Sequence, residues 1–419
     1  MNNLRAILPK SLGGIRRPQL LQSGGASPGD DRPRILTDVS VIIRNDAQTG
    51  IQRVVRAVWT NLLEQAGTHY EIVPVYAGRT QGYRYARPDF LSQPAAERLK
   101  GKRVQVQSGD RFLGLDLSAH VLPAHRRQLE MWRARGMNIH LVVYDLLPLR
   151  RPEWFTEKAV RRFKAWLEVV RDNCDQALCI SEQVARDLRE YLAAAAPCPA
   201  IGRLKLAGDI DGSCPSRGID TATESAIQYA SRHPAVLMVG TIEPRKGYDL
   251  ALAAFEQLWA NQGDRAPALI IVGKPGWRSV ALQRRLQTHA EAGRRLIWLT
   301  AVSDEGLARL YKACAGLLLA SHAEGFGLPA IEAAMHGKHA LVRDLPVFRE
   351  QELSNLIHFT DDGPGPFAQM IMELTRRSGT VPARDRLPTW TECVQCLLGE
   401  MGLTAGQVGR TDSRLRQAS

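Results

Sequence analysis

Hydrophobic and polar residues follow two recurring patterns along most of the chain. Short apolar runs such as 35–43 are typical of buried parallel strands. Segments with apolar residues every three to four positions are typical of amphipathic helices, and in 50–65 the side chains of Val54, Val58 and Leu62 share one face. Strands that alternate with helices indicate parallel sheets covered by helices on both faces.

The alternation occurs in two series separated by a polar stretch. The first predicts strands at 35–43, 71–76, 104–106, 112–115 and 139–144, with helices at 50–65, 122–135, 155–172 and 182–192. The second predicts strands at 235–240, 268–272, 296–299, 315–319 and 339–343, with helices at 248–262, 279–292, 304–313 and 329–336. Residues 208–225 between them lack apolar periodicity and indicate a linker.

These patterns predict an α/β protein of two Rossmann-like parallel-sheet domains with a cleft between them. A length of 419 residues also favours two domains. The expected division is a basic flexible tail over 1–34, a first domain over 35–210, a linker over 211–230, a second domain over 231–400 and a polar tail over 401–419.

Composition narrows the class of protein. No apolar run reaches the roughly 18 residues of a membrane span, and residues 1–23 lack the features of a secretory signal, so we expect a cytoplasmic protein. The Cys393–Cys396 spacing has no second pair nearby and indicates ordinary thiols in a reducing compartment. A net charge of +12 is compatible with nucleic acid, an anionic membrane or an acidic substrate. No zinc-finger spacing, RNA-binding signature or leucine zipper is present, which argues against nucleic acid.

The segment "SHAEGFGLPAIEAAMHGKHALV" at 321–342 carries the strongest chemical signal. Glu324 follows a buried strand, at the edge where open α/β sheets bind ligands. Gly325 and Gly327 permit a tight turn into a helix, whose amino terminus favours a phosphate. Glu332 lies early in that helix, so both carboxylates can face one ligand. The alternative is a strand–turn–helix corner with two solvated glutamates.

A second segment, "VLMVGTIEPRKGYD" at 236–249, runs from a buried strand into a loop with two adjacent cations. Arg245 and Lys246 stand just before a helix, where they can neutralise a departing diphosphate. Without the flanking pattern, adjacent basic residues are more often solvated.

Both segments resemble retaining glycosyltransferase family 4, over about 235–350. Glu324 and Glu332 match the glutamate–seven residues–glutamate signature of that family, and 236–249 resembles the start of its second domain. The resemblance implies a GT-B fold, a donor-binding second domain and an acceptor-binding first domain. It also implies sugar transfer from a nucleotide-sugar donor with retention of configuration, with no cofactor and no metal.

The resemblance also implies roles for individual residues. Glu324 and the loop after it contact the donor sugar and diphosphate, Arg245 and Lys246 hold the diphosphate, and Glu332 binds the ribose. Catalytic roles thereby fall to Glu324, Arg245, Lys246 and Asp145, and donor contacts to Gly50, Gly240, Val302, Ser303, Gly325, Phe326, Gly327, Leu328 and Glu332.

Two positions in the first domain depart from the family pattern. The first glycine loop has one glycine, Gly50, where members often have two, and Tyr144 stands where many members carry His. Ser181 fits the N-cap of the helix at 182–192 better than a catalytic role.

The first-domain motifs "TGIQRVVR" and "YDLLP" resemble bacterial mannosyl- and rhamnosyl-type enzymes of O-antigen or exopolysaccharide synthesis. GDP-mannose is the expected donor, ahead of dTDP-rhamnose or another nucleotide sugar, and a lipid-linked saccharide is the expected acceptor. Three alternatives stay open: a nucleotide-sugar epimerase of the same architecture, a basic nucleic-acid binder, and a non-catalytic partner subunit.

Basic residues cluster beside aromatic ones in the first domain. The clusters are Arg126, Arg127, Arg133 and Arg135 around Trp132, and Arg150, Arg151, Lys158, Arg161, Arg162 and Lys164 with Trp154, Phe155 and Trp166. An anionic lipid surface contributes roughly 1 kcal/mol per nearby cation, so these clusters predict reversible binding to an anionic membrane surface. The alternative is a solvated helix face with Phe163 and Leu167 turned to the core.

Overall fold

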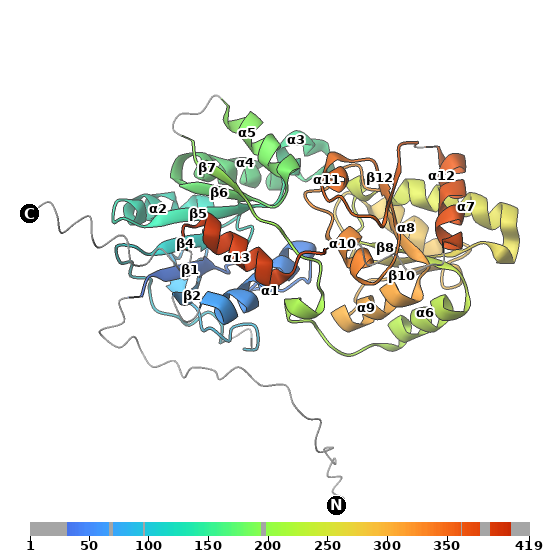
Figure 1. Cartoon of the computed structure of the whole chain (residues 1–419), viewed down its shortest axis with the longest axis horizontal. Coiled ribbons are helices and arrows are strands. Elements are labelled where there is room, and N and C mark those ends of the chain that lie inside the picture. Colours follow the sequence, from blue (N-terminus) through green and yellow to red (C-terminus); the bar gives the residue numbers. More distant parts are fainter. Residues whose placement is uncertain are drawn as a thin grey trace, which may run out of the picture. The chain divides into compact units, whose positions relative to one another are not determined.

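The computed structural model describes residues 32–66, 70–94, 97–193, 198–361, 363–377 and 386–403. From Pro33 onward these residues form one unit that contains two sheets (Figure 1). The tails predicted over 1–34 and 401–419 lie outside the described residues, except for 32–34 and 401–403.

The first lobe is built on a seven-stranded sheet in the order β3-β2-β1-β4-β5-β6-β7. Its strands are β1 Arg34–Asp38, β2 Glu71–Tyr76, β3 Arg84–Tyr85, β4 Arg111–Gly114, β5 Asn138–Val143, β6 Gln176–Cys179 and β7 Ala200–Arg203. All neighbours are parallel except β2 and β3. Its helices are α1 Gly50–Ala66, η1 Leu122–His125, α2 Arg126–Arg133, α3 Leu147–Arg150, η2 Pro152–Trp154, α4 Glu157–Asn173 and α5 Glu182–Leu192.

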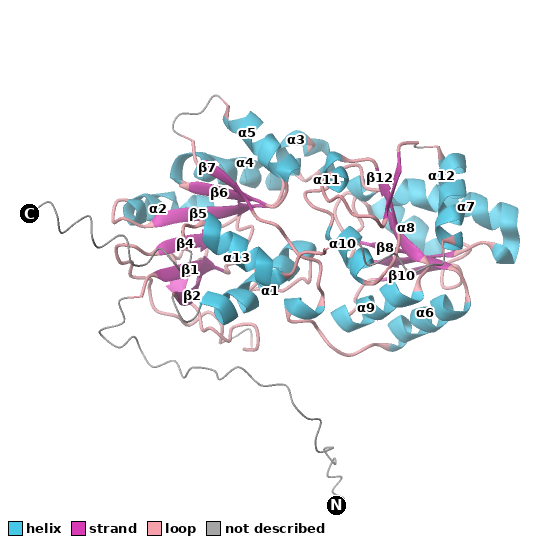
Figure 2. Cartoon of the chain, viewed as in Figure 1, coloured by secondary structure: helices cyan, strands magenta, loops and turns pink. Residues whose placement is uncertain are grey.

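The second lobe is built on a six-stranded, all-parallel sheet in the order β10-β9-β8-β11-β12-β13. Figure 2 labels β8, β10 and β12 of this sheet. Its strands are β8 Ala235–Val239, β9 Ala268–Val272, β10 Leu296–Leu299, β11 Gly316–Leu319, β12 Ala340–Arg343 and β13 Leu356–Phe359. Its helices are α6 Thr221–Arg232, η4 Pro244–Lys246, α7 Tyr248–Gln262, η5 Gly263–Arg265, α8 Val280–Thr288, α9 Asp304–Ala313, α10 Leu328–Met335, α11 Pro346–Arg349 and α12 Pro364–Arg376. The short helix η3 Asp211–Ser213 precedes them in the chain and packs against α1 of the first lobe.

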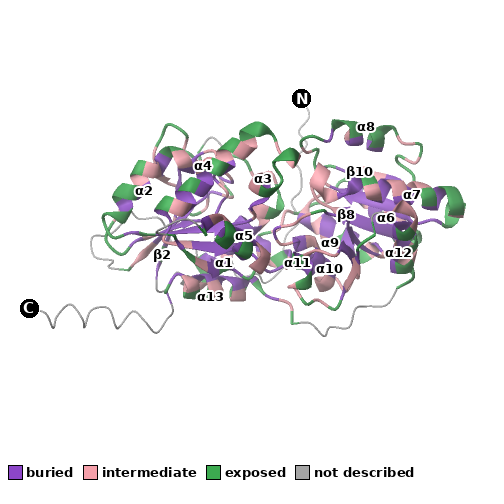
Figure 3. Cartoon of the chain, turned by 90° about the horizontal axis from the view of Figure 1, so that it is seen from above, coloured by how far each residue is buried: buried purple, intermediate pink, exposed green. Residues whose placement is uncertain are grey.

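The two parallel sheets confirm the predicted fold class. Strands β1, β4, β5, β8, β9 and β11 are buried along most of their length, and the exposed surface lies on helices such as α2, α4 and α8 (Figure 3). This explains why the strands read as continuous apolar runs and the helices as one-sided patterns. The prediction of a strand at 104–106 was wrong: Arg103, just before this range, forms an isolated bridge to Arg84 of β3, and no strand follows it.

Two helices do not belong to the parts of the chain in which the predicted domain boundaries placed them. The helix α13 (Trp390–Glu400) falls in the range predicted for the second domain, but it packs beside α1 and buries Trp390, Cys393 and Leu397 in the core of the first lobe (Figure 1). The helix α6 overlaps the predicted linker, yet its buried alanines and Ile227 belong to a core of the second lobe. The chain therefore returns to the first lobe after completing the second.

Candidate active site

Two loops at the carboxyl edge of the second sheet bring opposite charges together. Because β8 and β11 are neighbours in the sheet, η4 and the loop after β11 emerge side by side. The Glu324 carboxylate accepts hydrogen bonds from Lys246 Nζ at 2.6 Å, Arg245 Nη1 at 3.1 Å and Ser321 Oγ at 2.6 Å. Arg245 also pairs with Glu243 at 2.8 Å. The predicted catalytic residues of this lobe thus form one charged cluster.

The cluster fixes the protonation state of Glu324. Burial by itself would raise the pKa of this carboxyl, whose side chain is 8% exposed, but Lys246 and Arg245 lower that pKa to about 2. Burial and the neighbouring Arg245 lower the pKa of Lys246. Glu324 is therefore an anion at neutral pH and a weak base.

The glycine loop after Glu324 packs directly against the first lobe. A Cβ atom on Gly325 would lie 2.2 Å from the carbonyl oxygen of Tyr144, so the approach admits only glycine. Ser181 Oγ donates to the Gly325 carbonyl at 2.7 Å, while Phe326 and Leu328 pack into the core of the first lobe. Ser181 also caps α5 by accepting from an amide of its first turn, as predicted.

Asp145 and Tyr144 reach this loop from the end of β5. Asp145 lies beside Gly325, and burial raises the pKa of its carboxyl while Arg245 opposes the shift. Tyr144 is buried, and its hydroxyl donates to the Leu115 carbonyl at 2.8 Å. The side chain that replaces the frequent histidine therefore points into the first lobe.

Glu332 of α10 is held by a residue that sequence reasoning missed. Its carboxylate, 1% exposed, accepts from the Tyr311 hydroxyl at 2.7 Å and from Arg53 Nη1 on α1 of the first lobe. Arg53 Nη2 also donates to Asp304 at 2.7 Å. Arg53 stands inside the motif "TGIQRVVR", but nothing in that motif marks it as a partner of a residue 279 positions later.

Of the other predicted donor contacts, Gly240, Val302 and Ser303 follow strands of the second sheet, and Gly50 lies in the first lobe. Gly50 begins α1, where a Cβ atom would lie 3.7 Å from Leu328 Cδ1 of the signature loop. Gly240 follows β8 beside Lys246, and its carbonyl accepts from Tyr248 at 2.6 Å. Val302 and Ser303 precede α9, where Ser303 is the N-cap. Their predicted role against the nucleotide base stays a prediction.

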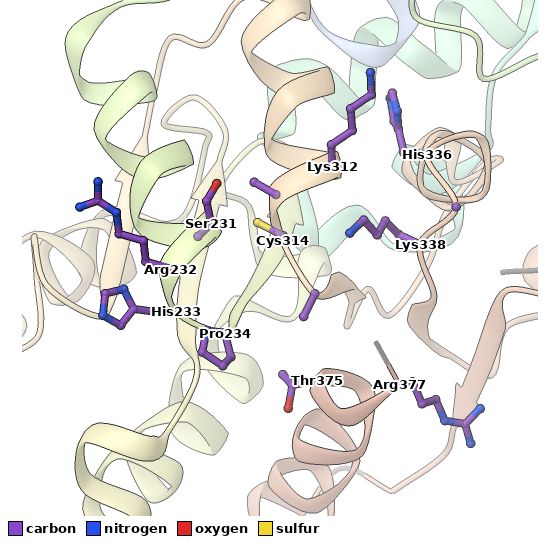
Figure 4. A pocket seen from close by; sticks show the side chains of 14 residues that line it. Ser231, Arg232, His233, Pro234, Lys312, Cys314, His336, Lys338, Thr375 and Arg377 are labelled. Atoms are coloured by element: carbon purple, nitrogen blue, oxygen red, sulfur yellow. The ribbon is translucent and has the colours of Figure 1, made fainter. Parts of the chain in front are cut away.

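A cavity of about 570 Å³ lies elsewhere, at the amino ends of β8, β11 and β12 (Figure 4). Its lysine and arginine lining residues stand at or just after the carboxyl ends of helices: Arg232 of α6, Lys312 of α9, Lys338 after α10 and Arg377 after α12. Cations at these positions offset the negative ends of helix dipoles, which accounts for the charge without a ligand.

The basic clusters of the first lobe divide between core and surface. Trp132 and Trp166 are buried in the core and cannot face a membrane. Arg133 pairs with Asp175 at 2.7 Å, and Arg126 and Arg150 also pair with acidic side chains.

Within the described ranges, no helix has both the length and the hydropathy of a bilayer span. In the same ranges, no three His, Cys, Asp or Glu side chains gather as metal ligands.

Comparison with known proteins defines the class. Residues 222–374 match the family described as Glycosyl transferases group 1. HepE of Anabaena, solved with UDP-glucose, superposes with a TM-score of 0.60 at 13% identity, covering 88% of this chain and 100% of that one. Sucrose-phosphate synthase from Thermosynechococcus elongatus gives 0.57 at 17% identity, covering 93% and 100%. Residues 222–374 are therefore a group 1 glycosyltransferase domain, and the chain has the GT-B fold.

A curated relative extends the similarity to both lobes. Serotype-specific mannosyltransferase WbdA of Escherichia coli is 35% identical over 382 residues, which are 89% of this chain and 45% of the relative. The chain thus spans about half the length of the curated relatives it matches first. The resemblance drawn from the two-glutamate signature is confirmed.

Proposed function

We propose that the protein is a retaining hexosyltransferase that moves mannose from GDP-mannose to a lipid-linked saccharide acceptor in surface polysaccharide synthesis. The observation that carries the proposal is the cluster of Arg245 and Lys246 around Glu324 at the carboxyl edge of the second sheet. The similarity to WbdA, named a mannosyltransferase, supports the choice of sugar.

The two cations account for departure of the nucleoside diphosphate. Breaking the glycosidic bond leaves negative charge on the diphosphate, and preorganised cations in a buried site stabilise that charge most strongly. The amino terminus of α10 adds backbone N–H groups and a positive dipole end. In this arrangement the bound diphosphate competes with Glu324 and Glu243 for Arg245.

Retention follows a front-face route in this proposal. A carboxylate with a pKa of about 2 is a weak base, so Glu324 does not take the acceptor proton. The leaving phosphate oxygen accepts that proton as the acceptor oxygen bonds to the anomeric carbon. The negative charge of Glu324 stabilises the positive charge that develops on the sugar. The alternative route is a short-lived covalent adduct of the sugar with Glu324.

A thermal-shift screen tests both the donor and the metal-independent mechanism. With excess EDTA present, GDP and GDP-mannose are expected to raise Tm more than UDP or dTDP, because a ligand of the folded state stabilises it by about 2.7 kcal/mol at 100 times Kd. No shift with any nucleotide would contradict a nucleotide-sugar donor. A shift that appears only after Mg²⁺ or Mn²⁺ is restored would contradict the cationic mechanism.

We further propose that the first lobe binds the cytoplasmic face of an anionic membrane, where the lipid-linked acceptor would lie. Lys158, Arg161 and Lys164 are exposed on α4 and support this placement. The protein should co-sediment with vesicles that contain anionic lipid at low salt. Replacement of Lys158, Arg161 and Lys164 by Gln should weaken this binding. Equal sedimentation with neutral vesicles, or no effect of the substitutions, would contradict the proposal.

A further inference from the structure

Arg53 joins the two lobes through the second glutamate of the signature. It lies on α1 of the first lobe, and its guanidinium reaches two carboxylates of the second lobe, Glu332 on α10 and Asp304 on α9. All three side chains are largely buried. Each nitrogen at the end of the fork binds a different carboxylate, so the position of Arg53 is set by both helices.

The contacts fix the orientation of the Glu332 carboxylate. Arg53 donates to Oε1 and the Tyr311 hydroxyl donates to Oε2, so each oxygen is held by its own donor. A carboxylate offers about four acceptor positions, and two donors leave capacity for two more hydrogen bonds. A ribose presents two such donors, its 2′- and 3′-hydroxyl groups.

A neighbouring arginine on α1 provides a comparison within the chain. Arg56 lies three residues further along the helix and is also buried. Its Nη1 pairs with Asp46 at 2.7 Å, and its Nη2 lies 3.6 Å from Asp304. Arg56 thus shares the inter-lobe charge environment of Arg53 but directs its main ion pair to a residue of its own lobe.

We infer that Arg53 is the positioning residue for Glu332, so that recognition of the nucleotide ribose by the second lobe depends on a side chain of the first. The inference rests on the proposed function, in which Glu332 binds the ribose. An arginine that only held the lobes together would affect affinity for any nucleotide equally. One that orients Glu332 affects only the part of the affinity that comes from the ribose hydroxyls.

Calorimetry with GDP and 2′,3′-dideoxy-GDP separates these two roles. The wild-type protein is expected to bind GDP about 10- to 100-fold more tightly than the dideoxy analogue, the range expected for lost hydrogen bonds to a charged group. Arg53→Gln should reduce that preference to about threefold or less, and Arg53→Lys should retain part of it. Arg56→Gln, the matched control, should keep the wild-type preference. If UDP gives the larger thermal shift, UDP is compared with its 2′,3′-dideoxy analogue. If dTDP does, dTDP is compared with its 3′-deoxy analogue, because its sugar carries only the 3′-hydroxyl.

Each outcome decides a different question. A wild-type protein that does not distinguish the two ligands would show that Glu332 does not bind the ribose, and the inference would fall with that role. A wild-type preference that survives unchanged in Arg53→Gln would overturn the inference while leaving the proposed function intact. Should Arg53→Gln not fold, Arg53→Lys and Asp304→Asn give the measurement. Arg53→Lys replaces the two terminal guanidinium nitrogens by a single ammonium group, and Asp304→Asn removes the charge of one of the two carboxylates that hold Arg53. An unchanged preference in both would then overturn the inference.

Discussion

Replacement of both Arg245 and Lys246 by Ala is expected to lower kcat by about 10³-fold or more. Removing one preorganised group that stabilises transition-state charge commonly costs 10²- to 10³-fold. Here two cations meet on Glu324 at 2.6 and 3.1 Å and would both face the departing diphosphate. Steady-state transfer kinetics with saturating donor would measure the loss.

The control for this double substitution comes from the same lobe. Arg284 and Arg285 are adjacent and exposed on α8, so Arg284→Ala with Arg285→Ala removes the same charge from the same domain. This control should transfer sugar at close to the wild-type rate. Because the active-site double mutant leaves Glu324 and Glu243 buried without their cations, its thermal unfolding must be compared with wild type. A folded double mutant with kcat within tenfold of wild type would contradict the proposal that Arg245 and Lys246 stabilise the departing diphosphate.

The sequence predicted the two sheets because buried parallel strands and one-sided helices have distinct periods. It also predicted where the signature lies, since Glu324 directly follows a buried strand. The meeting of Glu324 with Lys246, 78 positions apart, depends on β8 and β11 becoming neighbours in the sheet. Periodicity alone does not give that strand order. The family resemblance implied only that these residues contact the same donor diphosphate.

For two other features the sequence did not indicate which elements they contact. The apolar face of α13 shows that Trp390 and Leu397 are buried, but periodicity does not say in which core, and the structure places them in the first lobe. In the sequence, Arg53 is one of several cations on an amphipathic helix. Its role is visible only in the structure, where it pairs with carboxylates of α9 and α10. Its importance comes from tertiary contacts, which a single sequence does not encode as a pattern.

Substitution of the paired glutamates by Gln should separate chemistry from binding. Glu324→Gln is expected to lower kcat about 10²- to 10³-fold with a modest change in donor affinity, because its charge acts mainly as positive charge develops at the anomeric carbon. The wild-type enzyme also gives a prediction for pH. Since the pKa of Glu324 is held near 2, its charge is lost only as pH falls toward that value. The rate of the wild type should therefore show no titration of Glu324 between about pH 5 and 9, following the ordinary relation of charge to pKa.

Glu332→Gln should instead weaken nucleoside diphosphate binding by roughly 1.5–3 kcal/mol, the range for hydrogen bonds to charged groups. Its effect on kcat at saturating donor should be small, because the ribose contact serves ground state and transition state alike. Arg53 keeps Asp304 as a partner in this variant, so the lobe contact is only partly lost. Calorimetric titration and steady-state kinetics on both variants, with thermal unfolding as the check on folding, give the comparison. If both variants bind and turn over like wild type, the glutamates are only structural and the transferase proposal should be abandoned.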